Sequence, residues 1–138
     1  MFGETGKYKN WGHFFLNKGG NLTIQSKDVP PLAGVYYVCR LAKGQIDLVY
    51  IGKSGTVLQN GQFKKQTLKE RINNKQDGVK RQVFFDEKMT SEDIDALDIY
   101  WFVTMDKNNN DLPSYVEGLL IQRYFDVYGK LPPWNTAF

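Results

Sequence analysis

The clearest hydrophobic pattern in the chain lies at residues 97–105, which read LDIYWFVTM and place an apolar residue at every second position. Successive side chains of a β-strand point to opposite faces of a sheet, so a period of two predicts a strand. Just before it, Ser91 or Thr90 is suited to cap a short helix over residues 92–96.

Two further apolar runs lie close together earlier in the chain. Residues 33–41 (AGVYYVCRL) and 47–52 (DLVYIG) are rich in β-branched and aromatic residues, and Lys43-Gly44-Gln45 between them suits a turn. The short connection predicts an antiparallel hairpin. Tyr36 and Tyr50 would then lie on adjacent strands.

Helix signals follow the hairpin. Thr67 and Glu70 have the spacing of a capping box, which predicts a helix that begins there and turns Leu68 and Ile72 toward the core. On such a helix, Arg71 and Lys75 would share the adjoining edge. A second helix is predicted to open near Pro113 and to close at Gly129.

Residues 1–30 lack a regular pattern. Gly, Asn and Lys surround isolated aromatic residues up to Pro30-Pro31. This composition predicts an irregular arm or a short, poorly regular hairpin.

Length and composition limit the class of protein. A chain of 138 residues, with nine Phe and eight Tyr, is the size of one globular domain. Its single cysteine, Cys39, excludes an intrachain disulfide and a Cys-rich zinc site. No apolar run approaches the roughly 20 residues that span a bilayer, and the N-terminus does not look like a secretory signal. We therefore expect a cytoplasmic protein with no membrane partner.

Charge is distributed unevenly along the chain. The net charge is only +3, but residues 53–81 hold eight basic residues against Glu70 and Asp77, and residues 86–98 hold six acidic residues against Lys88. A basic face that binds DNA phosphates is one interpretation, and a solvated Lys-rich helix and loop is the other. The candidate DNA-binding residues are Lys64, Lys65, Lys69, Lys75 and Arg81.

Two tripeptides near the ends of the hairpin strands carry the strongest functional signal, Gly34-Val35-Tyr36 and Tyr50-Ile51-Gly52. Four polar residues follow in sequence order, namely Lys53, Arg71, Glu117 and Asn135. Together these residues resemble the nuclease site of the GIY-YIG family. The resemblance implies an α+β fold with a small central antiparallel sheet of about three strands flanked by helices. It also implies a nuclease domain at residues 31–138, with residues 1–30 as an N-terminal arm or extension.

The family resemblance implies hydrolysis of DNA phosphodiester bonds with a divalent metal, Mg²⁺ or Mn²⁺. Tyr50 would be the general base. An unperturbed tyrosine has a pKa of about 10, so Lys53, Arg71 and the metal would have to lower the cost of holding it as phenolate. Tyr36 would hydrogen-bond the attacking water or the phosphate.

The remaining matched residues would handle the metal and the phosphate. Arg71 would clamp the phosphate, for which its forked donors suit it better than Lys. Glu117 would be the single carboxylate ligand of the metal. Asn135 would orient the backbone or a water near the metal.

Two departures from the family pattern stand out, and alternatives stay open. The loop at residues 53–66 is longer than usual, and Lys75 occupies a position where a His or Tyr is common. The chain could instead be a catalytically silent DNA-binding or protein-interaction module that keeps the fold. On an unrelated α+β scaffold, Arg71 and Glu117 need not converge. A role in repair, restriction or mobile-element insertion, and a homodimer on DNA, are all compatible with the sequence.

Overall fold

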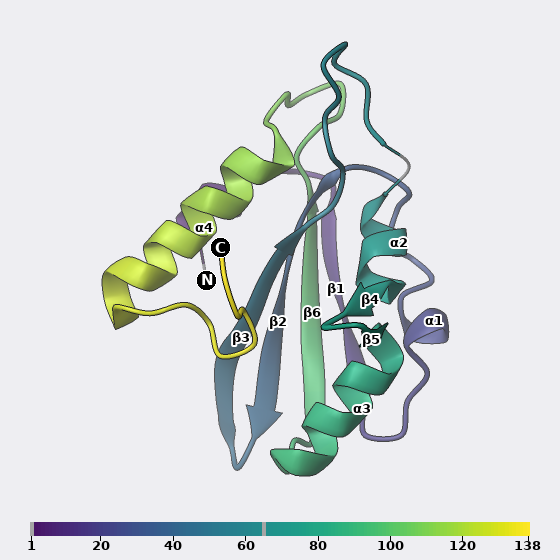
Figure 1. Ribbon diagram of the computed structural model, residues 1–138, viewed down its shortest axis with the longest axis vertical. Coiled ribbons are helices and arrows are strands. Elements are labelled where there is room, and N and C mark those ends of the chain that lie inside the picture. The colour runs from purple at the N-terminus through teal and green to yellow at the C-terminus, as the bar shows by residue number, and fades with distance from the viewer. Residues whose placement is uncertain (1, 65) are drawn as a thin grey trace.

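Four strands form one antiparallel sheet in the computed structural model, which describes residues 2–64 and 66–138 (Figure 1). The strands are β1 (Trp11–Asn17), β2 (Gly34–Ala42), β3 (Gln45–Lys53) and β6 (Ala96–Val103). They lie in the order β1-β6-β2-β3. The predicted α+β class, with a small central antiparallel sheet flanked by helices, is confirmed. The sheet has one strand more than the expected three.

Helices cover both faces of the sheet. They are α1 (Leu22–Gln25), α2 (Leu68–Asn73), α3 (Arg81–Ser91) and α4 (Pro113–Tyr128), with a 3₁₀ turn, η1, at Gly3–Thr5. Buried side chains of α1, α2 and α3 pack in one core with Leu97 and Ile99 of β6, and those of α4 pack in a second core with Val35 and Tyr37 of β2. No helix in residues 2–64 and 66–138 is long and apolar enough to cross a membrane.

The β2–β3 hairpin has the predicted pairing, with Tyr36 opposite Gly52 and Val38 opposite Tyr50. A Cβ atom built on Gly52 would lie 2.6 Å from Cζ of Tyr36, and one built on Gly34 would lie 1.9 Å from the backbone oxygen of Phe102. Both glycines therefore allow close contacts that any other residue would block.

Three helix boundaries follow from local chemistry and confirm the predictions. Thr67 and Glu70 form both hydrogen bonds of a capping box at the start of α2. Pro113 is the first residue of α4, and Gly129 ends that helix in the left-handed region at φ 68°.

Other boundaries differ from the sequence predictions. Because α2 ends at Asn73, Lys75 does not extend the helix edge but lies in β4 (Lys75–Gln76), which pairs with β5 (Val79–Lys80). The short helix predicted over residues 92–96 is wrong. Helix α3 ends just before it, at Ser91, and Asp93 has a φ of 53°, which does not continue a helix.

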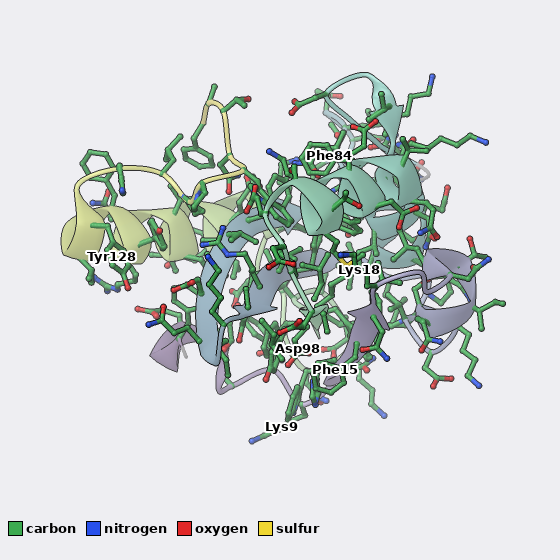
Figure 2. All side chains as sticks on the ribbon, turned by 90° about the horizontal axis from the view of Figure 1, so that it is seen from below. Lys9, Phe15, Lys18, Phe84, Asp98 and Tyr128 are labelled. Carbon is green, nitrogen blue, oxygen red and sulfur yellow. The ribbon has the colours of Figure 1, made fainter. Side chains whose placement is uncertain are left out.

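Residues 2–30 are more regular than predicted, because β1 pairs with β6 from Trp11 opposite Phe102 to Asn17 opposite Ala96. Trp11 and Phe15 are exposed on the outer strand. Figure 2 shows Phe15 and Asp98 on the side of the sheet that faces away from Phe84 of α3. The arm thus adds an edge strand with an aromatic face.

Candidate active site

A polar cavity of about 220 Å³ brings together three of the predicted catalytic residues. Tyr50 comes from β3, Arg71 from α2 and Asn135 from the segment after α4. Gln76 of β4 and Arg81 of α3 also line it. Side chains distant in sequence therefore converge at one opening.

The two motif tyrosines pack together, with ring centroids 6.0 Å apart. Tyr36 is only 1% exposed and is not among the residues that line the cavity, whereas Tyr50 is half-buried in its wall. Burial raises the pKa of the Tyr36 hydroxyl, although the charges of Arg81 and Arg71 oppose that rise. Tyr36 therefore stays protonated at neutral pH. Its position does not fit the expected contact with an attacking water, so Tyr50 is the better-placed base.

Asn135 fastens the C-terminal segment to β3. Its Oδ1 accepts a hydrogen bond of 3.0 Å from the Ile51 backbone N–H, and its Nδ2 donates one of 2.9 Å to the Ile51 carbonyl. Ile51 directly follows Tyr50 and is fully buried. Of the two roles expected for Asn135, this geometry matches the orientation of backbone.

Replacing Asn135 by Ala is expected to lower the free energy of unfolding by about 1–3 kcal/mol, because both backbone groups of buried Ile51 lose their side-chain partner. Urea denaturation measures the change. The exposed neighbour Thr136→Ala is the matched control and should differ little from wild type. Equal stability of the two variants would contradict an anchoring role for Asn135.

Glu117 lies in the second turn of α4. It is therefore not an acid of the first turn, where the helix dipole would stabilise it most. Burial raises the pKa of its carboxyl to about 7, and the positive charges of Lys53 and Arg71 act in the opposite direction. Glu117 makes no ion pair with any side chain that the structure describes. The positive charges of Lys53 and Arg71 thus lower the pKa of the Glu117 carboxyl, but neither side chain forms an ion pair with it.

As a single carboxylate, Glu117 fits one type of metal site. Across residues 2–64 and 66–138, no three His, Cys, Asp or Glu side chains are grouped as a metal site. A hard divalent ion takes carboxylate, water and phosphate oxygens as ligands. Glu117 therefore fits as the one charged protein ligand of an ion whose other positions go to water and substrate phosphate.

The predicted DNA-binding residues do not all lie on the surface. Lys64 and Lys75 are exposed, and Lys69 is half-buried with its Nζ donating to the Lys27 carbonyl at 3.0 Å. Lys65 lies outside the residues that the structure describes. Arg81 is only 2% exposed, so the prediction that it lies on a basic surface is wrong.

Arg81 instead belongs to the interior of the site. The carbon centre of its guanidinium lies 5.4 Å from the ring centroid of Tyr50 and 5.8 Å from that of Tyr36. In the sequence, Arg81 is one more positive charge in a basic region. Its only local signal was its place just before the apolar residues Phe84 and Phe85.

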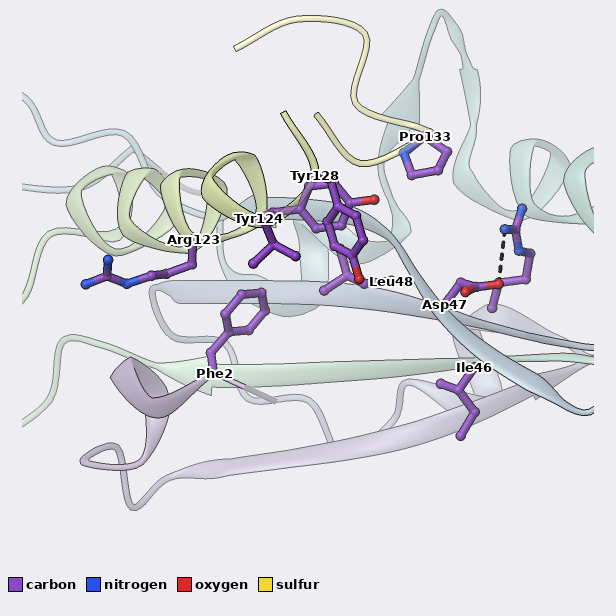
Figure 3. Close-up of a pocket in the computed structure, with 10 residues that line it drawn as sticks. Phe2, Ile46, Asp47, Leu48, Arg123, Tyr124, Tyr128 and Pro133 are labelled. Carbon is purple, nitrogen blue, oxygen red and sulfur yellow. Dashed lines mark hydrogen bonds and ion pairs between the residues drawn. The ribbon is translucent and has the colours of Figure 1, made fainter. Parts of the chain in front are cut away.

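A separate cavity of about 430 Å³ lies between α4 and β3 (Figure 3). Leu48, Tyr124 and Val127 are among the apolar residues that line it. It contains none of the predicted catalytic residues, three of which, Tyr50, Arg71 and Asn135, line the smaller polar cavity. Comparison of the chain with models of protein families, with curated proteins and with solved structures gave no match.

Proposed function

We propose that the protein is a divalent-metal-dependent DNA endonuclease that uses the chemistry of GIY-YIG nucleases. The observation that carries this proposal is convergence: Tyr50, Arg71 and Asn135 line one polar cavity although they are far apart in sequence. Glu117 adds a carboxyl that senses the charge of Arg71. An unrelated scaffold would have no reason to gather these residue types.

Each residue has a definite task in the proposed reaction. The Tyr50 phenolate removes a proton from water as the water oxygen forms a bond to phosphorus. The bond from phosphorus to a sugar oxygen then breaks, and that oxygen leaves with a proton from solvent. Arg71 binds the phosphate oxygens as their charge increases. A divalent ion held by Glu117 would supply further positive charge to the phosphate.

The direct test incubates the purified protein with supercoiled plasmid and Mg²⁺ or Mn²⁺. We expect nicked or linear DNA with metal and intact plasmid with a chelator. An Arg71→Ala preparation, purified in parallel, controls for contaminating nucleases. Binding without cleavage would instead favour a silent DNA-binding module, and neither binding nor cleavage would favour a protein-interaction module.

DNA affinity should depend steeply on salt, because each neutralised phosphate releases counterions and contributes about −0.9 to the logarithmic slope. We expect that changing the exposed Lys64, Lys75 and Lys80 together to Gln makes the slope shallower by about 2–3. Fluorescence anisotropy at several salt concentrations measures the slope.

The matched control for the salt experiment removes three exposed lysines elsewhere, Lys9, Lys18 and Lys43. This variant has the same net charge as the first one, but its slope should stay close to that of wild type. Equal slopes for the two variants would place the DNA path away from the region between Lys64 and Lys80.

A further inference from the structure

Arg81 is a charged side chain in an interior position. Its guanidinium lies over the rings of Tyr36, Tyr50 and Phe85, at 5.4–5.9 Å from their centroids. Its Nη2 donates to the backbone carbonyl of Arg71 at 3.3 Å, whereas Nε and Nη1 are buried and form no hydrogen bond with the residues that the structure describes. The side chain is therefore held in place with two donors unused.

No acid that the structure describes is paired with this charge. Within the described residues Arg81 makes no ion pair, and the cavity beside it holds two more cations, Arg71 and Lys75, against the single acid Asp77. Burial of a cation without an anion or a full set of hydrogen bonds is costly. The rings of Tyr36 and Tyr50 offset part of that cost through cation–π contact. A negative charge formed beside Arg81 would offset more of it.

We propose that Arg81 is a positioning residue of the reaction, which fixes the rings of Tyr36 and Tyr50 and stabilises negative charge on the Tyr50 oxygen. Of the two tyrosines, only Tyr50 lines the cavity and can exchange its proton with solvent. Its hydroxyl loses a proton to solvent before turnover, and the resulting phenolate takes a proton from the attacking water. The catalytic part of this inference rests on the proposed function, but the electrostatic part does not.

Several groups face Tyr50 and share its electrostatic environment. They come from each neighbouring element: Tyr36 of β2, Arg71 of α2, Lys75 and Asp77 of the β4–β5 hairpin, and Arg81 of α3. Lys75 is exposed, so water screens its charge. Arg81 is buried against the ring, so its effect on the Tyr50 oxygen should be the larger.

The test follows phenolate absorbance near 295 nm as pH rises, without DNA or metal. Subtracting the Tyr50→Phe curve from the wild-type curve isolates the contribution of Tyr50. The titration is then repeated with Arg81→Met, whose unbranched apolar side chain fills the site, and the curve of the Arg81→Met, Tyr50→Phe double variant is subtracted from it. We expect the midpoint of the isolated step to move up by about one pH unit or more. Lys75→Met should move it less.

Arg81→Lys keeps the charge and should restore a midpoint near that of wild type, which a purely structural role would not require. Near-ultraviolet circular dichroism checks folding, and Arg81→Gln replaces Arg81→Met if the latter does not fold. A folded variant with an unmoved midpoint overturns the inference, even if wild type cleaves DNA. A moved midpoint in a protein that never cleaves DNA supports the electrostatic role and defeats the proposed nuclease function.

Discussion

Replacing Tyr50 by Phe is expected to lower the rate of DNA cleavage by about two orders of magnitude or more, the usual scale for loss of a general base. The change removes one hydroxyl and keeps the ring that packs on Tyr36 and under Arg81. Folding and DNA affinity should therefore remain close to wild type. Single-turnover cleavage, anisotropy and thermal unfolding on one preparation measure the three quantities.

Tyr36→Phe is the matched control for this substitution. It removes the same group from the other motif tyrosine, whose hydroxyl is buried next to Gly52 and whose pKa is raised by burial. Because that hydroxyl does not reach the cavity, its loss should reduce cleavage much less than the loss of the Tyr50 hydroxyl. Wild-type rates in Tyr50→Phe, together with a large loss in Tyr36→Phe, would reverse the two roles.

Local chemistry explains which parts of the fold were predictable. The capping box at Thr67, Pro113 at the start of α4 and Gly129 at its end each act within one turn of chain. Strand β1 is different, because its backbone gains hydrogen bonds by pairing with β6, whose residues come 79 to 91 positions later. A signal that depends on a distant partner is weak in a single sequence.

The residues of the candidate site also differ in how far the sequence predicts their positions. The order of Tyr50, Arg71 and Asn135 suggested a common site, and the structure brings all three to one cavity. Sequence alone did not reveal that Tyr36 and Arg81 are buried, because burial depends on which layer packs over a side chain. Arginine is rarely buried without a partner, so its composition-based assignment to the surface was the ordinary expectation.

Glu117→Gln is expected to abolish metal-dependent cleavage, because the amide keeps the shape of the side chain but lacks the charge that holds a hard cation. DNA affinity without metal should be maintained or increased, since a carboxylate near the phosphate path is removed. Nicking assays and anisotropy on the same preparation test both expectations. Asp126→Asn, which also removes one negative charge from the exposed face of α4, controls for the change in helix charge.

The raised pKa of Glu117 gives the same variant a stability signature without DNA. With a folded-state pKa of about 7 and an ordinary value of 4.5, the unfolded chain loses its proton first as pH rises. Glu117 therefore lowers wild-type stability progressively between pH 4.5 and 7, by at most about 3 kcal/mol and by less after screening by water. Metal-free Glu117→Gln should thus gain stability relative to wild type between pH 4 and pH 8.

Divalent metal should reverse that difference at pH 8. An ion that binds the ionised carboxylate of the folded state stabilises wild type in proportion to the logarithm of its concentration, and Glu117→Gln should not respond. Thermal unfolding with increasing Mn²⁺, in both proteins, measures this effect independently of catalysis. The same Mn²⁺ response in both proteins, or wild-type cleavage by Glu117→Gln, would remove Glu117 from the metal site and leave it a partly buried acid beside Lys53 and Arg71.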